Sequence, residues 1–251
     1  GALNYRGISI EDIIAGCDRD NRFGFEEVVW LLLFGDLPTK EKLDWFRGVL
    51  ADVRELPQYF AEDMIIKAPS KNIMNKLSRS VLALYSYDPE PDNTSLENVL
   101  RQCIGLIAKL PVIMSYAYQV KRRYYDGKSM FFHPIDPNHS TAECILSSIR
   151  PDRAFAEKEA MMLDRCLMLH ADHGGGNNST FSCRVLTSSG TDPYSAYTAA
   201  IGSLKGPRHG GANIKVSGMF EDIKKNVADW TCREEVYDYL AKILHKEAFD
   251  K

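Results

Sequence analysis

The chain has 251 residues, of which 45% are hydrophobic and 26% charged, and a formal net charge of -3. This composition is typical of a globular protein of one large or two small domains, and it lacks the basic excess of nucleic-acid-binding domains. We find no apolar run long enough to span a bilayer, and residues 1–6 do not resemble a signal peptide. The six cysteines are scattered, without a C-x-x-C pair. They are therefore expected to be free thiols in a reducing compartment, and a cytoplasmic location is expected.

Helical spacing of apolar residues begins near the N-terminus. Ser9 has the position of an N-cap in a capping box. Residues 25–34 are apolar almost all round, which predicts a buried helix that ends at Gly35. The pair Pro38-Thr39 opens the next helix, which has an apolar stripe of Leu43, Phe46 and Leu50.

The middle of the chain continues the helical pattern. A further amphipathic helix carries Ile73, Leu77, Val81 and Leu84. Residues 88–94 form the clearest loop. A helical stripe then follows over residues 96–110, and Pro111 is expected to kink or break this helix before it continues over residues 112–125. Because no strand pattern stands out, the sequence predicts a mostly α-helical, all-α fold.

The first segment with chemical potential is residues 169–180, which contains two histidines, three glycines and two asparagines. One face of the preceding helix carries Ala160, Leu163, Leu167 and His170. The histidines should therefore lie at a helix C-terminus, followed by a glycine turn and by a new helix capped by Asn177 or Asn178. His170 and His173 are three residues apart and could share a zinc ion, but no third ligand occurs at a recognisable spacing, so no metal site is expected. A glycine C-cap with core histidines is the alternative interpretation.

The second segment is residues 206–213. A helix that starts at Thr191-Asp192-Pro193 should end at Gly206-Pro207, and another should begin at Gly210. His209 is therefore expected near a helix N-terminus, where the helix dipole disfavours the imidazolium form. A neutral imidazole there can donate a hydrogen bond to a carbonyl oxygen on which an enolate charge develops. The alternative is a histidine in a helix–helix turn whose partner is the backbone.

Taken together, these motifs resemble citrate synthase. The likeness rests on His-Ala-Asp-His-Gly-Gly-Gly-Asn at 170–177, Thr-Asp-Pro-Tyr at 191–194 and Gly-Pro-Arg-His-Gly-Gly-Ala-Asn at 206–213. Residues 3–7 and 26–38 also match the opening of that family. One departure is Gly174, where many bacterial members have a glutamate.

The resemblance implies a homodimer that condenses acetyl-CoA with oxaloacetate and water to give citrate and CoA, with acetyl-CoA as substrate and no bound cofactor. It also implies that the partners are small molecules, not nucleic acid or membrane. By the same resemblance, His209 polarises the thioester carbonyl, while His173 and Asn177 bind oxaloacetate. Three further residues are expected to support the site: His170, Gly210 and Asn213.

In the family, the aspartate base, a third histidine and the main arginines follow the matched region. We therefore expect a large, dimer-forming domain over residues 1–208, the first helices of a small domain over residues 209–251, and no activity for this piece alone. The sequence leaves two alternatives open. One is 2-methylcitrate synthase, which shares these motifs and takes propionyl-CoA, and the other is a helical dimerisation scaffold without chemistry.

Overall fold

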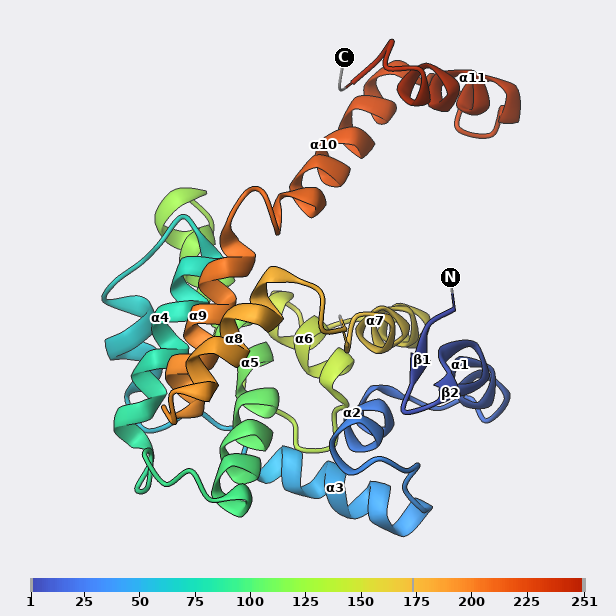
Figure 1. Ribbon diagram of the computed structural model, residues 1–251. Coiled ribbons are helices and arrows are strands. Elements are labelled where there is room, and N and C mark those ends of the chain that lie inside the picture. The colour runs from blue at the N-terminus through green and yellow to red at the C-terminus, as the bar shows by residue number, and fades with distance from the viewer. Residues whose placement is uncertain (1, 173, 250–251) are drawn as a thin grey trace. The chain divides into compact units, whose positions relative to one another are not determined.

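The computed structural model describes residues 2–172 and 174–249. The chain divides into two compact units, residues 1–202 and 203–251, and each is described by itself. Both units are built from helices, which confirms the predicted all-α class (Figure 1).

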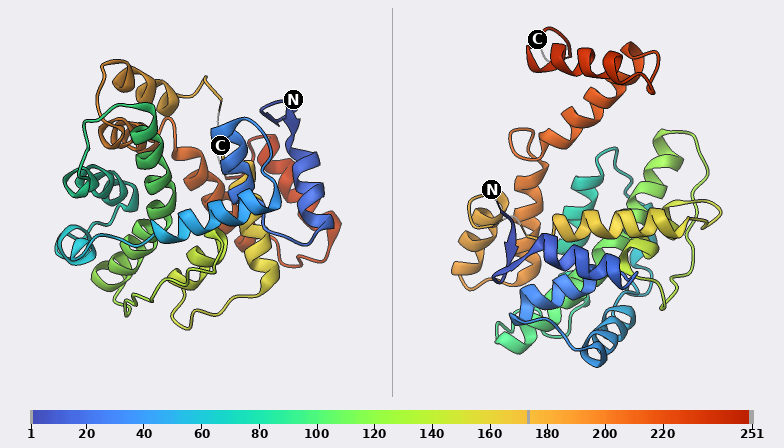
Figure 2. Two further views of the ribbon diagram at one scale, coloured as in Figure 1. Left: turned by 90° about the horizontal axis from the view of Figure 1, so that it is seen from below. Right: turned by 90° about the vertical axis from the view of Figure 1, so that its right-hand side faces the viewer.

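The first unit opens with a short antiparallel hairpin that the sequence did not predict. Its strands are β1 (Asn4–Tyr5) and β2 (Ile8–Ser9), which lie beside α1 (Ile10–Arg19) (Figure 2). Arg6 and Gly7 at the turn both have positive φ, 51° and 88°, as the tight turns of two-residue hairpins require. The Ser9 hydroxyl caps α1 as predicted, but it accepts from the Glu11 N–H, one residue earlier than in a capping box.

The next two helices match their predictions. α2 spans Phe25–Phe34 and ends at Gly35, whose φ is 93° and whose N–H donates to the Leu31 carbonyl oxygen at 2.9 Å. α3 spans Lys40–Asp52 behind the Thr39 N-cap. Its buried side chains are the expected Leu43, Phe46 and Leu50. α2 is buried over its first two turns, but Phe34 at its end is exposed.

Pro111 was expected to kink or break its helix, but it does not break it: α5 (Leu96–Tyr125) is one continuous helix of 30 residues. A proline in a helix removes one hydrogen bond and costs about 3 kcal/mol. Buried side chains just before and after Pro111, including Ala108, Val112 and Ile113, pack in the core and offset that cost. Ser115 also donates its hydroxyl to the Pro111 carbonyl oxygen at 2.8 Å.

The continuity of α5 also changes the expectation that no apolar segment is long enough to span a bilayer. Among the described residues, α5 is the one helix long and apolar enough to cross a bilayer, with a mean hydropathy of 1.4 in its most apolar window. The sequence expectation missed it because it divided the helix at Pro111. In the structure 44% of that window is buried. α5 packs against α3, against α4 (Ile73–Leu84), against the π-helix η1 (Ala61–Ile66) and against α6 (Thr141–Ile149), which accounts for its composition as a core helix.

After α6 come α7 (Glu157–Leu169), α8 (Asn178–Ser188) and α9 (Pro193–Lys205). The apolar face predicted for α7 is wrong in part. Its buried residues are Ala160, Asp164 and Met168. The buried face is displaced because the carboxylate of Asp164 accepts hydrogen bonds from the backbone N–H groups of Gly24 at 2.8 Å and of Phe25 at 3.0 Å, and so caps α2.

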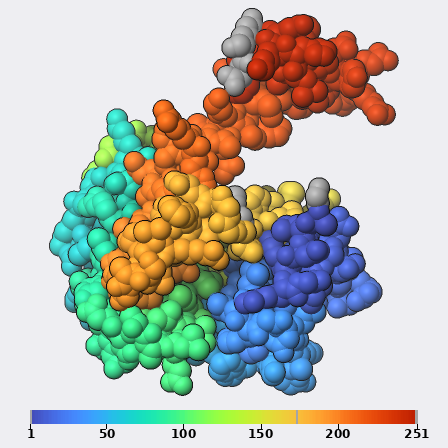
Figure 3. Space-filling view, in the orientation of Figure 1, coloured from blue at the N-terminus to red at the C-terminus, as the bar shows by residue number. Residues whose placement is uncertain are grey.

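The second unit contains α10 (Gly211–Asn226) and α11 (Arg233–Leu244), following the end of α9. Its small core includes Ile223, Val227 and Ala248. The Tyr239 hydroxyl donates to an Asp222 carboxylate oxygen at 2.7 Å and so joins the two helices. Within the first unit, α8 and α9 form the orange surface of the space-filling view (Figure 3).

Candidate active site

The end of α7 positions the first histidine motif. Tyr5, which is almost fully buried, donates its hydroxyl to the Met168 carbonyl oxygen at 2.8 Å and to that of Leu169 at 3.3 Å. These bonds satisfy two of the carbonyl groups that a helix C-terminus leaves without intrahelical partners. Burial raises the pKa of the Tyr5 phenol, so it remains a donor at neutral pH. Tyr5 therefore fixes the place at which the chain leaves α7.

His170 is the C-cap of α7 and is exposed. Its Nδ1 lies 2.7 Å from the Cys166 carbonyl oxygen. Since a carbonyl can only accept, Nδ1 carries the hydrogen in this arrangement. The other histidine of the motif, His173, lies outside the described residues. The expectation that the two histidines hold no metal therefore stays a prediction. Among the residues that are described, no group of three metal-ligating side chains is present.

The glycine turn after the motif has a specific backbone requirement. Gly174 has a φ of 66°, and its N–H donates to an Asp172 carboxylate oxygen at 3.0 Å. A left-handed φ favours glycine, so the departure from the glutamate found in many family members suits this turn.

Asn177 caps α8, which decides between the two predicted asparagine caps. Its Oδ1 accepts from the Thr180 N–H at 2.9 Å and from the Ser179 hydroxyl at 2.8 Å. Its Nδ2 donates to the Thr180 hydroxyl oxygen at 2.9 Å. The carboxamide therefore builds the turn, and the substrate contact predicted for Asn177 stays a prediction.

Arg184 is a cation that the sequence interpretation missed. It lies in α8, and a Cβ placed on Gly175 would be 3.6 Å from its Nη1, so the guanidinium group lies against the glycine turn. The sequence does contain a signal for it, because Arg184 follows Asn177 by seven residues, or about two helical turns. A guanidinium group is suited to a carboxylate ligand.

In the second unit, His209 lies in the turn before α10, as predicted. The backbone N–H of His209 donates to the Gly206 carbonyl oxygen at 3.0 Å. The backbone N–H of Gly210, the N-cap of α10, donates to the same oxygen at 2.9 Å. A Cβ on Gly210 would overlap the Leu204 carbonyl oxygen, so only glycine fits there. Asn213 lies in the first turn of α10 and is exposed. The structure thus brings His170 and Asn177 to one turn, and His209, Gly210 and Asn213 to another, in separate units.

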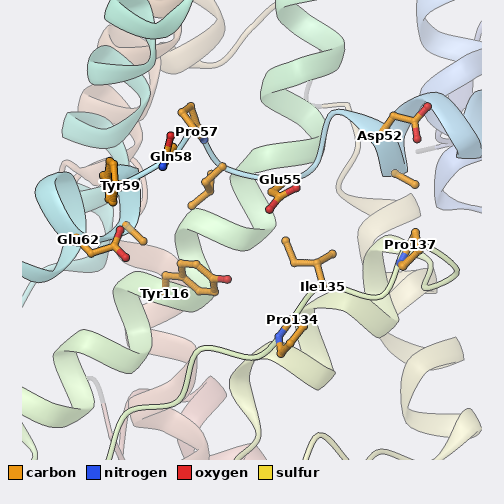
Figure 4. Close-up of a pocket in the computed structure, with 13 residues that line it drawn as sticks. Asp52, Glu55, Pro57, Gln58, Tyr59, Glu62, Tyr116, Pro134, Ile135 and Pro137 are labelled. Carbon is orange, nitrogen blue, oxygen red and sulfur yellow. The ribbon is translucent and has the colours of Figure 1, made fainter.

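A hollow elsewhere in the first unit contains none of the predicted site residues. This cavity of about 620 Å³ lies between the end of α3, η1, α5 and residues 134–137 (Figure 4). Asp52, Glu55 and Glu62 line it beside Tyr116. Burial and then the nearby Cys144, Glu55 and Glu62 raise the pKa of the Tyr116 phenol.

Comparison with known proteins places the two turns in context. The model of the citrate synthase C-terminal domain family matches residues 1–250. The chain belongs to the citrate synthase family. It is 36% identical over 236 residues to 2-methylcitrate synthase 1 of Corynebacterium glutamicum, an alignment that covers 91% of this chain and 58% of the relative. It is 32% identical over 228 residues to citrate synthase of Synechocystis sp., covering 89% of this chain and 53% of that protein.

The fold agrees with this assignment. The crystal structure of citrate synthase from Thermotoga maritima superposes with a TM-score of 0.72 at 27% identity, over 99% of this chain and 60% of that one. The recognition of the family from the two histidine motifs is therefore confirmed. The chain spans a little over half of the length of the curated relatives it matches, 58% and 53% for the two named above.

Proposed function

We propose that the protein functions in a citrate synthase reaction, in which acetyl-CoA, oxaloacetate and water give citrate and CoA. The observation that carries this proposal is that the family match over residues 1–250 includes both histidine turns. In each turn the backbone has a conformation or a close approach that requires glycine, at Gly174 and at Gly210. In this reaction a carboxylate base removes a proton from the acetyl methyl group. The resulting enol attacks the ketone carbon of oxaloacetate to form citryl-CoA. Water then cleaves the thioester to release citrate and the CoA thiol.

In this proposal the second unit stabilises the enol. His209 donates a hydrogen bond to the thioester oxygen, whose negative charge increases as the methyl proton leaves. A donor aimed at developing charge lowers the barrier more than it stabilises the bound substrate. Gly210 keeps the turn compact where it passes the Leu204 carbonyl group, and Asn213, to which the resemblance assigns a supporting role, lies in the first turn of α10.

The first unit in turn binds oxaloacetate. His173, outside the described residues, and Asn177 are the contacts that the family resemblance assigns. Arg184 adds a positive charge beside the glycine turn, where a substrate carboxylate would be held by a charge-assisted hydrogen bond. His170 fixes the end of α7 through its bond to the Cys166 carbonyl oxygen.

A second candidate reaction is 2-methylcitrate formation from propionyl-CoA. It is favoured by relatives of that name at 36% and 33% identity, beside citrate synthases at 32% and 35%. The deciding experiment measures thiol release by the full-length parent protein with oxaloacetate and either acetyl-CoA or propionyl-CoA. A higher kcat/KM for acetyl-CoA supports citrate synthase, and the reverse supports 2-methylcitrate synthase. No turnover of either would favour the non-catalytic scaffold.

For residues 1–251 alone we predict no condensing activity. The family resemblance places the aspartate base, a third histidine and the main arginines beyond the matched region, and each missing acid or base costs about 10²–10⁴ in rate. The same thiol-release assay measures this, with the full-length parent as the positive control. Turnover of residues 1–251 within tenfold of the parent would show that the base lies in this chain.

A further inference from the structure

Two side chains from distant parts of the sequence complete the end of α7. His170, within the histidine motif, contacts the Cys166 carbonyl oxygen through its Nδ1 at 2.7 Å. The Met168 and Leu169 carbonyl oxygens instead accept from the Tyr5 hydroxyl, which belongs to β1 and lies beside α7 (Figure 1). Where the histidine motif begins, the geometry of the helix end therefore depends on a strand at the other end of the first unit's sequence.

The hairpin that carries Tyr5 is itself held in place. The Tyr5 side chain is 1% exposed and packs in a core cluster with side chains of α1, α2 and α7, among them Ile13 and Met168. At the turn of the hairpin, Arg6 donates from Nε and Nη2 to the Leu32 carbonyl oxygen near the end of α2, at 3.2 and 2.7 Å. The ring is thus fixed by the core and the hairpin by α2, so the hydroxyl is a stationary donor for the end of α7.

The start of α2 is fastened to α7 as well. The Asp164 carboxylate of α7 accepts from the backbone N–H groups of Gly24 and Phe25 at 2.8 and 3.0 Å. A Cβ on Gly24 would lie 2.8 Å from the Met168 Sδ, so the chain entering α2 approaches the last turn of α7 closely. With Asp164 at one end of α2 and the hairpin at the other, the last two turns of α7 are held as one piece with α2.

The residues that follow α7 are those on which the proposed function places oxaloacetate. They begin at His170 and continue through the turn at Gly174 to the Asn177 cap. Binding groups have to be held within about 0.5 Å of their productive place, and a displacement of about 1 Å can cost about 10² in rate. We propose that Tyr5 is a positioning residue of the oxaloacetate site, which sets where the chain leaves α7 and hence where the histidine turn meets the substrate. The inference rests on the proposed function and assigns Tyr5 no contact with the substrate itself.

Oxaloacetate titration of the full-length parent protein tests this role without turnover. Tyr5→Phe keeps the buried ring and removes only the hydroxyl, and we expect the Kd for oxaloacetate to rise about tenfold because the turn is no longer held in place. Ile13→Val is the matched control. It removes a methyl group from the same core cluster and so costs stability, but it leaves the hydroxyl in place and should leave the Kd unchanged. Urea unfolding of both variants compares their losses of stability.

A donor restored at the same place separates positioning from stability. Tyr5→4-aminophenylalanine, made by nonsense suppression, puts an N–H donor where the hydroxyl was and should recover most of the lost affinity. Should Tyr5→Phe not fold, Arg6→Gln takes its place, because it loosens the hairpin from α2 at an exposed position and should raise the Kd in the same way.

The outcomes distinguish this inference from the proposed function. If the unmodified parent binds oxaloacetate but Tyr5→Phe binds it as tightly as Ile13→Val does, the role of Tyr5 is overturned and the proposed function stands. Failure of the amino group to recover affinity, or an unchanged Kd in Arg6→Gln when that variant is the one tested, would overturn it equally. If the unmodified parent does not bind oxaloacetate, the proposed function fails and this inference fails with it.

Discussion

At the scale of single residues, His209 and Arg184 are proposed to act at different stages, and this can be measured. In the full-length parent, His209→Ala should lower kcat by about 10²–10³, the usual effect of losing one donor to a developing oxyanion. Oxaloacetate affinity should change less than threefold, because an interaction made only in the transition state does not contribute to ground-state binding.

Arg184→Gln should have the opposite signature. A hydrogen bond to a charged group contributes about 1.5–3 kcal/mol, so the Kd for oxaloacetate should rise about tenfold or more while kcat falls less. Oxaloacetate titration and steady-state thiol release on both variants give the two quantities. His245→Ala, at the end of α11, is the matched control and should change neither. A loss of oxaloacetate affinity in His209→Ala with turnover retained would exchange the two roles.

Gly210 gives a residue-scale prediction that depends only on sterics. Gly210→Ala should displace the turn that carries His209, because the new methyl group meets the Leu204 backbone carbonyl. We expect destabilisation of at least about 1–3 kcal/mol, typical of a strained or overpacked site. At neighbouring Gly211 a Cβ would lie 3.9 Å from Pro207 Cβ, an ordinary contact in the first turn of α10. Gly211→Ala should therefore be neutral or stabilising in urea unfolding, and equal losses in the two variants would contradict this explanation.

At the scale of elements, Asp88 joins α9 to α5. Its buried carboxylate accepts from the Tyr194 hydroxyl at 2.7 Å, from Arg101 at 2.6 Å and from Gln102 at 3.1 Å. Desolvation acts to raise the pKa of Asp88, but the hydrogen bonds from Tyr194, the Glu90 N–H, Arg101 and Gln102 outweigh it and lower the pKa to about 2. A carboxylate whose folded pKa is depressed stabilises the fold above its unfolded pKa, here about 3.8. That contribution is lost as the pH falls from about 4 to about 2.

Tyr194→Phe tests this connection. At pH 7 it should lower the free energy of unfolding by about 1.5–3 kcal/mol, since it removes a hydrogen bond to a buried charge. The loss should shrink as the pH falls below 4, where Asp88 becomes protonated in the unfolded state and then in the folded one. The matched control is Tyr85→Phe, because the Tyr85 hydroxyl donates to an Asp92 oxygen at the same 2.7 Å but in an exposed setting. Urea unfolding at several pH values measures both, and an equal loss in the two variants would argue against a special role for burial.

The elements also show what the sequence can and cannot predict. The stripe of Leu43, Phe46 and Leu50 and the Asn177 cap followed from local rules, because spacing and cap chemistry act within one or two turns. The apolar face predicted for α7 was wrong in part and Pro111 does not break α5, because both depend on partners far along the chain. The buried Asp164 carboxylate belongs to the start of α2, and core packing on either side carries α5 through Pro111.

The residues of the candidate site also divide into those that the sequence predicts and those that it does not. The motifs identified His170, Asn177 and His209 as candidates, and the family comparison supports the motifs that contain them. Arg184 was missed because its local signal, the seven-residue spacing from Asn177, does not by itself place a guanidinium group against the glycine turn.

At the scale of the whole molecule, exposed apolar side chains suggest association surfaces, and dimer formation by residues 1–208 stays a prediction. In the first unit, large apolar side chains are exposed on α2, α5 and α8, among them Phe34, Leu96 and Phe181. In the second unit, α11 exposes Tyr237, Leu240 and Leu244 by 70%, 40% and 82%. These residues recur at i, i+3 and i+7 and therefore lie along one face of the helix.

We predict that residues 1–251 self-associate at micromolar concentration through this face of α11. Exposing a leucine side chain forgoes about 1.5–3 kcal/mol of burial, so two exposed leucines beside an exposed tyrosine favour contact with another surface. Leu240→Glu with Leu244→Glu should shift the sedimentation coefficient toward that of a monomer while leaving the helix content of the far-ultraviolet circular dichroism spectrum unchanged. Lys242→Glu is the control, since it alters charge on the same helix outside the apolar face and should leave association intact. A clean monomer for the unmodified chain, or association that survives the double substitution, would assign any dimer of the parent protein to another surface.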